Sequence, residues 1–166
     1  MKKIASVVAI LALAISASGA YAANSLSKGT FGLNVGTDPG FIVNGKYFIQ
    51  SDMAILGGFG LGIAGGDAKG TDIGLIVGGR KYLHVADFAP FVGGRLTYSS
   101  VLDSTIKSTG LIAEAGAEYF LAKQFSFEGR VGFGYTSTDV DNPILGKSKT
   151  SNIGTTTFGI SFNFYF

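Results

Sequence analysis

Alternation of large apolar residues with small or polar residues runs through most of this 166-residue chain and limits what it can fold into. In the C-terminal segment, one side of the repeat carries only large apolar residues: Phe158, Ile160, Phe162, Phe164 and Phe166. The residues between them are Gly159, Ser161, Asn163 and Tyr165. A period of two is that of a β-strand, whose successive side chains point to opposite faces. The segment therefore predicts a strand with one apolar face.

The same pattern recurs in blocks of about ten residues, separated by clusters of Gly, Asp, Ser and Lys that favour turns. Segments 41–49 and 73–83 are the least regular of these blocks. Aspartates fall at or beside the connections, whereas all three glutamates fall within strands on the small or polar face. Counting the blocks predicts an all-β fold of eight antiparallel strands.

The placement of charge decides between a soluble barrel and a membrane barrel. A soluble barrel has large apolar side chains inside and charges outside, and a membrane barrel reverses this order. Only 14% of the residues are charged, against about 25% in a soluble domain, so the strands cannot supply a solvated exterior. The 26 glycines suit a narrow lumen with little room for side chains. We therefore predict an up-and-down transmembrane β-barrel, because strands of about ten residues cross a bilayer core of roughly 25 Å.

The first 22 residues have the layout of a secretory signal peptide. A positive head at residues 1–3 precedes an apolar or small run at 4–15, and Ala20-Tyr21-Ala22 is a small-x-small cleavage site. Two of the 13 basic residues, Lys2 and Lys3, lie here, so the remaining chain carries 11 basic and 11 acidic residues. The formal net charge of +2 for the full chain comes from these two lysines, so it gives no indication of nucleic-acid binding. We expect residues 1–22 to be removed and residues 23–166 to form the barrel.

The lengths of the connections predict two different ends of the barrel. Short turns are expected at 50–52, 84–87 and 122–124, and longer loops at 64–72, 99–108 and 137–152, with a short connection at 37–40. Short turns at one rim and long loops at the other are typical of outer-membrane barrels.

Charged residues on the small or polar faces predict a cluster inside the lumen. On the lipid face at mid-depth, a charge costs about 2–4 kcal/mol, so we expect these side chains to point inward and to pair: Lys46, Arg80, Arg95, Glu114, Glu118, Glu128 and Arg130. A weak repeat aligns Lys46-Tyr47 with Lys81-Tyr82 and Glu118-Tyr119. That alignment places Lys81 rather than Arg80 in the lumen, unless a bulge at Gly78-Gly79 reconciles the two patterns. Tyrosines suited to the membrane interface form the predicted girdle: Tyr47, Tyr82, Tyr98 and Tyr119.

Catalytic and cofactor sites receive little support from the residues. The absence of cysteine excludes thiol nucleophiles and cysteine-ligated metals, and the only histidine, His84, falls in a predicted short turn. Asp139 and Asp141 could bind a cation, but Lys147 and Lys149 lie in the same predicted loop. The glycine-rich stretch 57–62 is not followed by a helical pattern and does not predict a nucleotide site. We expect no enzyme activity, cofactor or metal.

Residues 23–166 resemble the small eight-stranded outer-membrane barrels of Gram-negative bacteria, the group of OmpX, the OmpA transmembrane domain and the opacity proteins. The most specific element is the terminal strand with Phe162, Phe164 and Phe166, which resembles the signal read by the barrel-assembly machinery. Glu118, within Gly116-Ala117-Glu118-Tyr119, resembles the interior glutamate of OmpA-like barrels. Arg130 follows it across the turn at a position suited to a partner, but Glu128 is an equally near neighbour, so the sequence leaves the partner of Arg130 open.

The resemblance implies Sec-dependent export to the outer membrane, with periplasmic chaperones as partners during biogenesis. It also implies contact with outer-membrane lipid and lipopolysaccharide and a monomeric state. The expected role is non-enzymatic, structural or in surface interaction, with the lumen closed by paired charges. The alternative is a narrow porin-like channel for ions or small solutes.

Overall fold

The computed structural model describes residues 26–36, 42–64, 70–102, 106–142 and 146–166. In these ranges the chain forms β1 (Phe31–Gly36), β2 (Ile42–Gln50), β3 (Met53–Ala64), β4 (Gly70–Tyr82), β5 (Phe88–Val101), β6 (Ile106–Ala122), β7 (Phe125–Asn142) and β8 (Gly146–Tyr165). The predicted strands at 41–49 and 73–83 correspond to β2 and β4. The predicted leader, residues 1–22, lies outside the described residues. Within the described ranges, no helix has the length and apolar character to cross a membrane.

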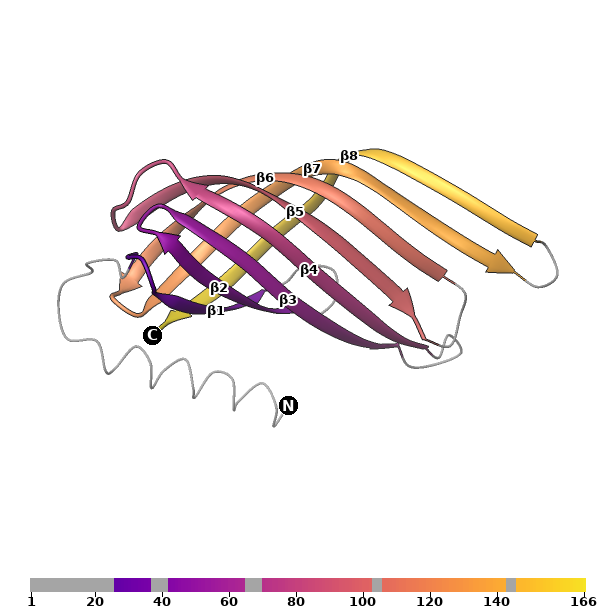
Figure 1. The fold of residues 1–166 in the computed structure, drawn as a ribbon, viewed down its shortest axis with the longest axis horizontal. Helices are drawn as coiled ribbons and strands as arrows, with labels where there is room; N and C mark the ends of the chain where they lie inside the picture. The colour runs from indigo at the N-terminus through magenta and orange to yellow at the C-terminus, as the bar shows by residue number, and fades with distance from the viewer. Residues whose placement is uncertain (1–25, 37–41, 65–69, 103–105, 143–145) are drawn as a thin grey trace.

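Each strand pairs antiparallel with the next, and β1 pairs with β8, so the sheet closes into a barrel (Figure 1). The closing ladder is short and runs from Gly32 opposite Tyr165 to Gly36 opposite Ser161. Closure gives both of these strands a second hydrogen-bonding neighbour along this ladder. The predicted all-β, up-and-down, eight-stranded antiparallel barrel is confirmed.

The period-two pattern sorts the side chains between the two surfaces of the barrel. On β4, Ile76 is 7% exposed and its neighbour Val77 is 63% exposed. The same contrast holds on β7, where Arg130 is buried and Phe133 is exposed. Large apolar side chains from every strand point outward. The inward positions carry small, polar and charged residues, together with a set of buried large apolar side chains that includes Ile76 and Phe91. A contiguous apolar exterior of this kind requires a nonaqueous environment or a partner.

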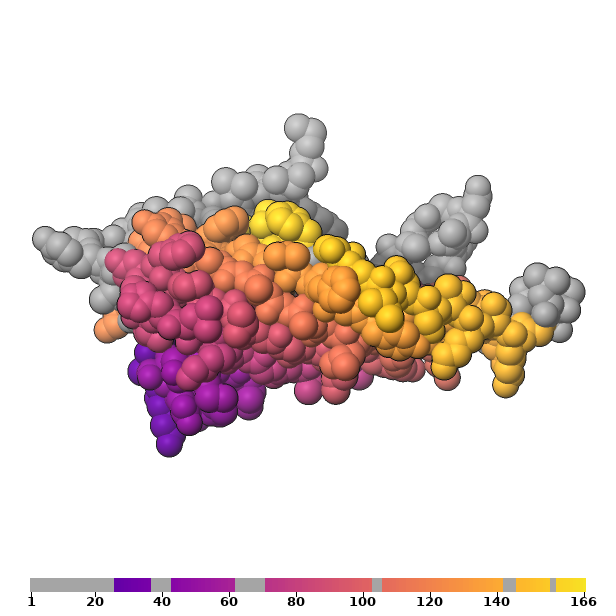
Figure 2. Space-filling model, turned by 90° about the horizontal axis from the view of Figure 1, so that it is seen from above, coloured from indigo at the N-terminus to yellow at the C-terminus, as the bar shows by residue number. Residues whose placement is uncertain are grey.

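The strands lengthen along the chain from 6 residues in β1 to 20 in β8, and the last hairpin projects beyond the rest of the barrel (Figures 1 and 2). Most of the predicted loop 137–152 is therefore strand, since β7 continues to Asn142 and β8 begins at Gly146. The predicted loop 99–108 is shortened in the same way, and β3 reaches Ala64 at the edge of the predicted loop 64–72. The predicted connections are therefore too long here, because Ser, Thr and paired charges continue the ladder without an apolar face.

Glycines open space beside the arginines that point into the lumen. A β-carbon at Gly93 would lie 2.6 Å from the carbonyl oxygen of Gly79 and 3.3 Å from Cα of Arg80. A β-carbon at Gly78 would lie 2.6 Å from the carbonyl oxygen of Gly94 and 3.0 Å from Cβ of Arg95. The close approach of neighbouring strands at these rungs therefore depends on glycine.

Candidate functional site

The candidate site is the interior of the barrel, where all the side chains predicted for the charge cluster are buried. Each is at most 5% exposed: Lys46 on β2, Arg80 on β4, Arg95 on β5, Glu114 and Glu118 on β6, and Glu128 and Arg130 on β7. A buried charge is tolerated when it is paired and hydrogen-bonded. The contacts of each carboxylate therefore show whether the buried charges are paired and whether their side chains fill the lumen.

Glu118 accepts hydrogen bonds on both carboxylate oxygens. Lys46 Nζ lies 3.1 Å from Glu118 Oε2, and the Tyr82 hydroxyl donates to the same oxygen at 2.7 Å. The hydroxyls of Ser126 and Tyr165 donate to Oε1. This carboxylate is therefore saturated by donors from several walls of the barrel.

Glu128 forms the second centre of the network. Arg80 Nη1 donates to Glu128 Oε2 at 2.7 Å, and Lys46 Nζ lies 3.2 Å from the same oxygen. Arg130 Nη1 donates to the other oxygen, Oε1, at 2.8 Å. The sequence left open whether Arg130 pairs with Glu118 or with Glu128, and the structure places it against Glu128. Lys46 joins the two centres, because it contacts both carboxylates.

Arg80 extends the network to the third glutamate. Its Nη2 donates to Glu114 Oε1 at 2.8 Å, and Arg95 Nε lies 3.6 Å from Glu114 Oε2. The Arg80 guanidinium also stacks 3.7 Å above the centre of the Phe91 ring, a cation–π contact. Four cationic and three anionic side chains are thus linked through contacts that cross the lumen.

Neutral polar side chains continue this network toward the β1–β8 closure. Asn34 Nδ2 donates to Asn163 Oδ1 at 2.6 Å and to the Ser161 hydroxyl at 2.9 Å. Asn163 in turn donates to Ser126 at 3.0 Å, and Arg130 donates to Ser161 at 3.0 Å. These bonds connect the closing strands to the charged centre, and no sequence pattern pointed to them beyond their inward position.

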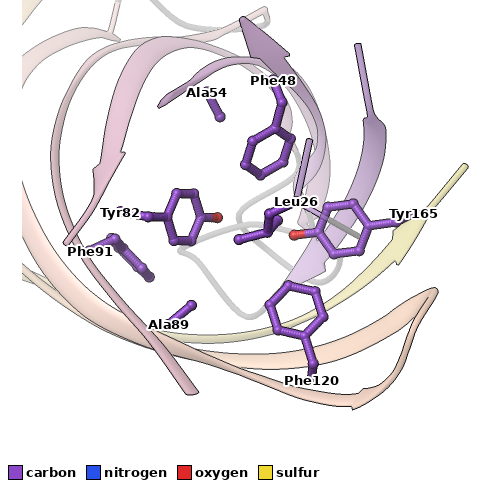
Figure 3. Packing of buried hydrophobic residues seen from close by; sticks show 8 residues of the cluster. All are labelled: Leu26, Phe48, Ala54, Tyr82, Ala89, Phe91, Phe120 and Tyr165. Carbon is purple, nitrogen blue, oxygen red and sulfur yellow. The ribbon is translucent and has the colours of Figure 1, made fainter. Parts of the chain in front are cut away.

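Below the charges, at the end of the barrel with the short turns, lies an aromatic layer. It consists of Phe48, Tyr82, Phe91, Phe120 and Tyr165, packed with Leu26, Ala54 and Ala89 (Figure 3). Neighbouring rings are in contact, with centroids 5.5 Å apart for Phe48 and Tyr82 and 5.6 Å apart for Phe120 and Tyr165. The tyrosine hydroxyls join this layer to Glu118 and Lys46.

A different repeat underlies these two layers. An inward polar residue is followed two positions later by an inward aromatic in Lys46-Tyr47-Phe48, Arg80-Lys81-Tyr82, Glu118-Tyr119-Phe120 and Asn163-Phe164-Tyr165. The sequence alignment of Lys81-Tyr82 with Lys46-Tyr47 was out of phase by one residue. Because residues two apart share a face of a strand, this spacing alone could have predicted both layers.

Tyr82 is therefore a correction to the predicted girdle. It is 1% exposed inside the barrel, whereas Tyr47, Tyr98 and Tyr119 are between 39% and 50% exposed on the outside. The pairing of β4 with β3 and β5 has no register shift, so there is no bulge at Gly78-Gly79.

The regular register of β4 also resolves the choice between its two cations. Arg80 is in the lumen, and Lys81 points outward and pairs with Asp52 in the turn between β2 and β3. The Lys81 hydrogen bond lowers the pKa of Asp52 below its ordinary value. This exposed pair is separate from the buried network.

The remaining predicted positions lie on the surface. Phe162 and Phe164 are half-buried beside Phe125, with ring centroids 5.9 and 5.1 Å from it, and Phe166 is exposed. Their role as an assembly signal stays a prediction. His84 is exposed in the connection between β4 and β5. Among the residues described, no three His, Cys, Asp or Glu side chains are grouped as metal ligands would be.

The two aspartates considered for cation binding face lysines across the β7–β8 hairpin. Lys149 Nζ lies 3.9 Å from Asp139 Oδ1, and Lys147 Nζ lies 3.5 Å from Asp141 Oδ2. These are exposed cross-strand pairs, which contribute little to stability.

Comparison with known proteins places this geometry among solved barrels. The N-terminal β-barrel domain of Pseudomonas aeruginosa OprF matches with a TM-score of 0.56 and 12% identity, covering 84% of this chain and 98% of that one. The outer membrane protein OprG from Pseudomonas aeruginosa also matches with a TM-score of 0.56 and 12% identity, covering 88% and 99%. The fold is that of a small outer-membrane barrel. No protein-family model and no curated protein sequence matches the chain.

Proposed function

We propose that this protein is a non-enzymatic, integral outer-membrane barrel with a closed lumen and a structural or surface-interaction role. The observation that carries the proposal is the opposite character of the two barrel surfaces. Leu96, Leu111 and Phe133 are each more than half exposed on the outside, while the charge cluster is buried within. This is the reverse of a soluble barrel and the arrangement that lipid requires.

The height of the apolar exterior supports a bilayer span. On β5 the outward side chains run from Phe88 at the short-turn end to Tyr98, ten positions along the strand, without an outward charge. At about 3.3 Å per residue and a tilt near 45°, this stretch covers about 23 Å of membrane. On β6, Tyr119 and Lys107 delimit a similar stretch. The span therefore fits a hydrocarbon core with polar hairpin ends beyond it.

The packing of the interior supports a closed lumen rather than a channel. The aromatic layer fills the short-turn end, and the contacts of Lys46, Glu118 and Glu128 cross the space above it. An eight-stranded barrel is just wide enough for such side chains to fill. A conducting path would require these pairs to separate.

The projecting hairpins are the surface available for interactions outside the membrane. In its described residues, 137–142 and 146–152, the outer part of the β7–β8 hairpin carries mainly Ser, Thr and the exposed Asp–Lys pairs, with Val140 as the one large apolar residue. Lipid and lipopolysaccharide around the barrel, the assembly machinery and chaperones during biogenesis, and a monomeric state belong to the same proposal, as does Sec export of a chain whose first 22 residues are a leader.

Two measurements test this function. Outer-membrane extracts run without boiling should contain a faster-migrating band that shifts on heating, and its absence counts against the membrane barrel. In planar bilayers the purified protein should give no steady openings. Salt-dependent openings that vanish when Glu128 and Arg130 are neutralised together would replace the closed barrel with the narrow channel.

A further inference from the structure

The residues just before β1 form a tight turn at the short-turn end of the barrel. Thr30 N donates to the Ser27 carbonyl oxygen at 3.1 Å, and the Ser27 and Thr30 hydroxyls are 2.9 Å apart. Gly29, the third residue of this turn, has φ of +91°, which a type II turn requires and glycine permits. Residues 26–30, called the N-terminal turn below, are therefore a defined structural unit.

Two backbone hydrogen bonds attach the N-terminal turn to β2. Gly29 N donates to the Phe48 carbonyl oxygen at 2.8 Å, and Phe48 N donates to the Thr30 carbonyl oxygen at 3.0 Å. They add one rung to the β1–β2 ladder beyond the Phe31–Tyr47 pair. The turn then reverses the chain and directs Leu26 back toward the barrel.

Leu26 is 6% exposed and packs within the aromatic layer. In Figure 3 it lies in the middle of the layer, between Tyr82 and Tyr165, with Phe48 and Phe120 on the other sides. The hydroxyls of these two tyrosines contact Lys46 and Glu118. The apolar side chain of Leu26 thus fills the centre of the layer that covers the charged network. Leu26 belongs to no strand, so displacing it breaks no sheet pairing.

We propose that the N-terminal turn is a cork, and that Leu26 is the apolar plug that seals the short-turn end of the lumen. The aromatic layer forms the pocket that holds Leu26, and Leu26 belongs to the same chain as the pocket. Access of water-soluble molecules from this end then requires Leu26 to withdraw. The inference rests on the closed lumen of the proposed function but concerns a separate element, because the ion pairs could close the barrel without any cork.

Cysteine labelling tests the cork directly, because the chain contains no cysteine. Ala89 is fully buried in the aromatic layer, and Ala54, a second reporter position, is 2% exposed. An Ala89→Cys protein, folded and purified in detergent, is treated with a small charged methanethiosulfonate reagent, and the labelling rate is measured by mass. The same rate is then measured with Leu26→Ala added. Leu83→Ala, at an outward position 64% exposed at the same end, is the matched control.

We expect Leu26→Ala to accelerate labelling of Cys at position 89 at least tenfold, and Leu83→Ala to leave the rate unchanged. Gly29→Val, which strains the turn at a positive φ without a contact within 4 Å of its β-carbon, should accelerate labelling by the same route. Heat-modifiability of each variant establishes that the barrel is folded. If the Ala89→Cys protein does not fold, the same labelling rates are measured on an Ala54→Cys protein.

Equal labelling rates in the proteins with Leu26 and with Leu26→Ala would overturn the proposal. An acceleration by Leu83→Ala equal to that by Leu26→Ala would overturn it as well. Rapid labelling while Leu26 is intact would overturn it too. Bilayer conductance tests the proposed function independently, since a non-conducting protein with Leu26-independent labelling retains its closed lumen and loses only the cork.

Discussion

Lys46 and Glu118 are 72 residues apart in the chain, yet Lys46 Nζ lies 3.1 Å from Glu118 Oε2 at the centre of the barrel. The strands that carry them, β2 and β6, do not pair in the sheet. The contact therefore braces opposite walls across the lumen. Lys46 also contacts Glu128, so one ammonium group holds two carboxylates near each other. This arrangement makes the stability of the barrel depend on its interior charges.

Neutralising Glu118 should destabilise the folded barrel. In Glu118→Gln the fold keeps the side-chain volume but loses the charge that Lys46 and two tyrosines contact. Removing one partner of a buried ion pair costs about 3–5 kcal/mol. Urea unfolding of the purified barrel, refolded in detergent or lipid vesicles, measures the change in the free energy of unfolding.

An exposed carboxylate supplies the control for this variant. Asp139→Asn removes a partner of Lys149 on the β7–β8 hairpin, where both side chains are more than half exposed. Its effect should stay below about 1 kcal/mol. If Glu118→Gln unfolds at the same urea concentration as the wild-type protein, the buried pairing does not stabilise the barrel.

Removing the Tyr82 hydroxyl should also destabilise the protein. Tyr82→Phe keeps the ring in the aromatic layer but removes the donor to Glu118, which lies 2.7 Å away. A hydrogen bond to a charged group contributes about 1.5–3 kcal/mol. Tyr119→Phe is the matched control, because Tyr119 is 50% exposed on the outside. Equal unfolding midpoints for the two variants would contradict the stabilising hydrogen bond from Tyr82 to Glu118 and favour an outward Tyr82 in the tyrosine girdle.

Adjacent glycines on β5 should tolerate alanine differently. Gly93→Ala places a methyl group 2.6 Å from a backbone oxygen, whereas the nearest atom to a β-carbon at Gly94 is 3.6 Å away. Overpacking of this kind costs about 1–3 kcal/mol. Gly94→Ala should be neutral or slightly stabilising, since glycine weakens a strand interior. Thermal or urea unfolding of both variants measures the difference, and equal losses would contradict the crowding at Gly93.

The Asp52–Lys81 pair should make a small, pH-dependent contribution at the short-turn end. The Lys81 hydrogen bond lowers the pKa of Asp52, so the folded state favours the ionised carboxylate. The contribution is present above the ordinary aspartate pKa of about 3.9 and is lost as the pH falls through the lower folded value. NMR titration of the Asp52 carboxyl carbon should show the lowered midpoint, and Lys81→Gln should move it back up. An unchanged midpoint in that variant would exclude Lys81 as the cause.

Several features of the site were predictable because they depend on local periodicity. Glu114, Glu118 and Arg130 could be assigned to the lumen because each alternates with outward residues on a regular strand. The partner of each charge could not, because partners come from strands far apart in sequence. Arg130 contacts Glu128 rather than Glu118, although both carboxylates lie nearby in the chain.

Tyr82 shows where local patterns failed. The short sequence repeat aligned Tyr82 with Tyr47 and so predicted an outward side chain. A shift of one residue in such an alignment moves a side chain to the other face of a strand. The strands at the polar hairpin ends were not predicted, for a different reason. Without an apolar face, Ser- and Thr-rich segments give no periodic signal, although their backbones pair as well as the rest.

The sequence by itself determined an eight-stranded antiparallel barrel, its apolar exterior and its interior charges apart from the choice between Arg80 and Lys81. These follow from which residues alternate, and alternation is a local property of the chain. Only the tertiary structure decided which charges meet, that Tyr82 joins an aromatic layer, and that Leu26 fills its centre. Those contacts depend on strand register and on the closure of β1 onto β8, which bring together side chains that no local pattern relates.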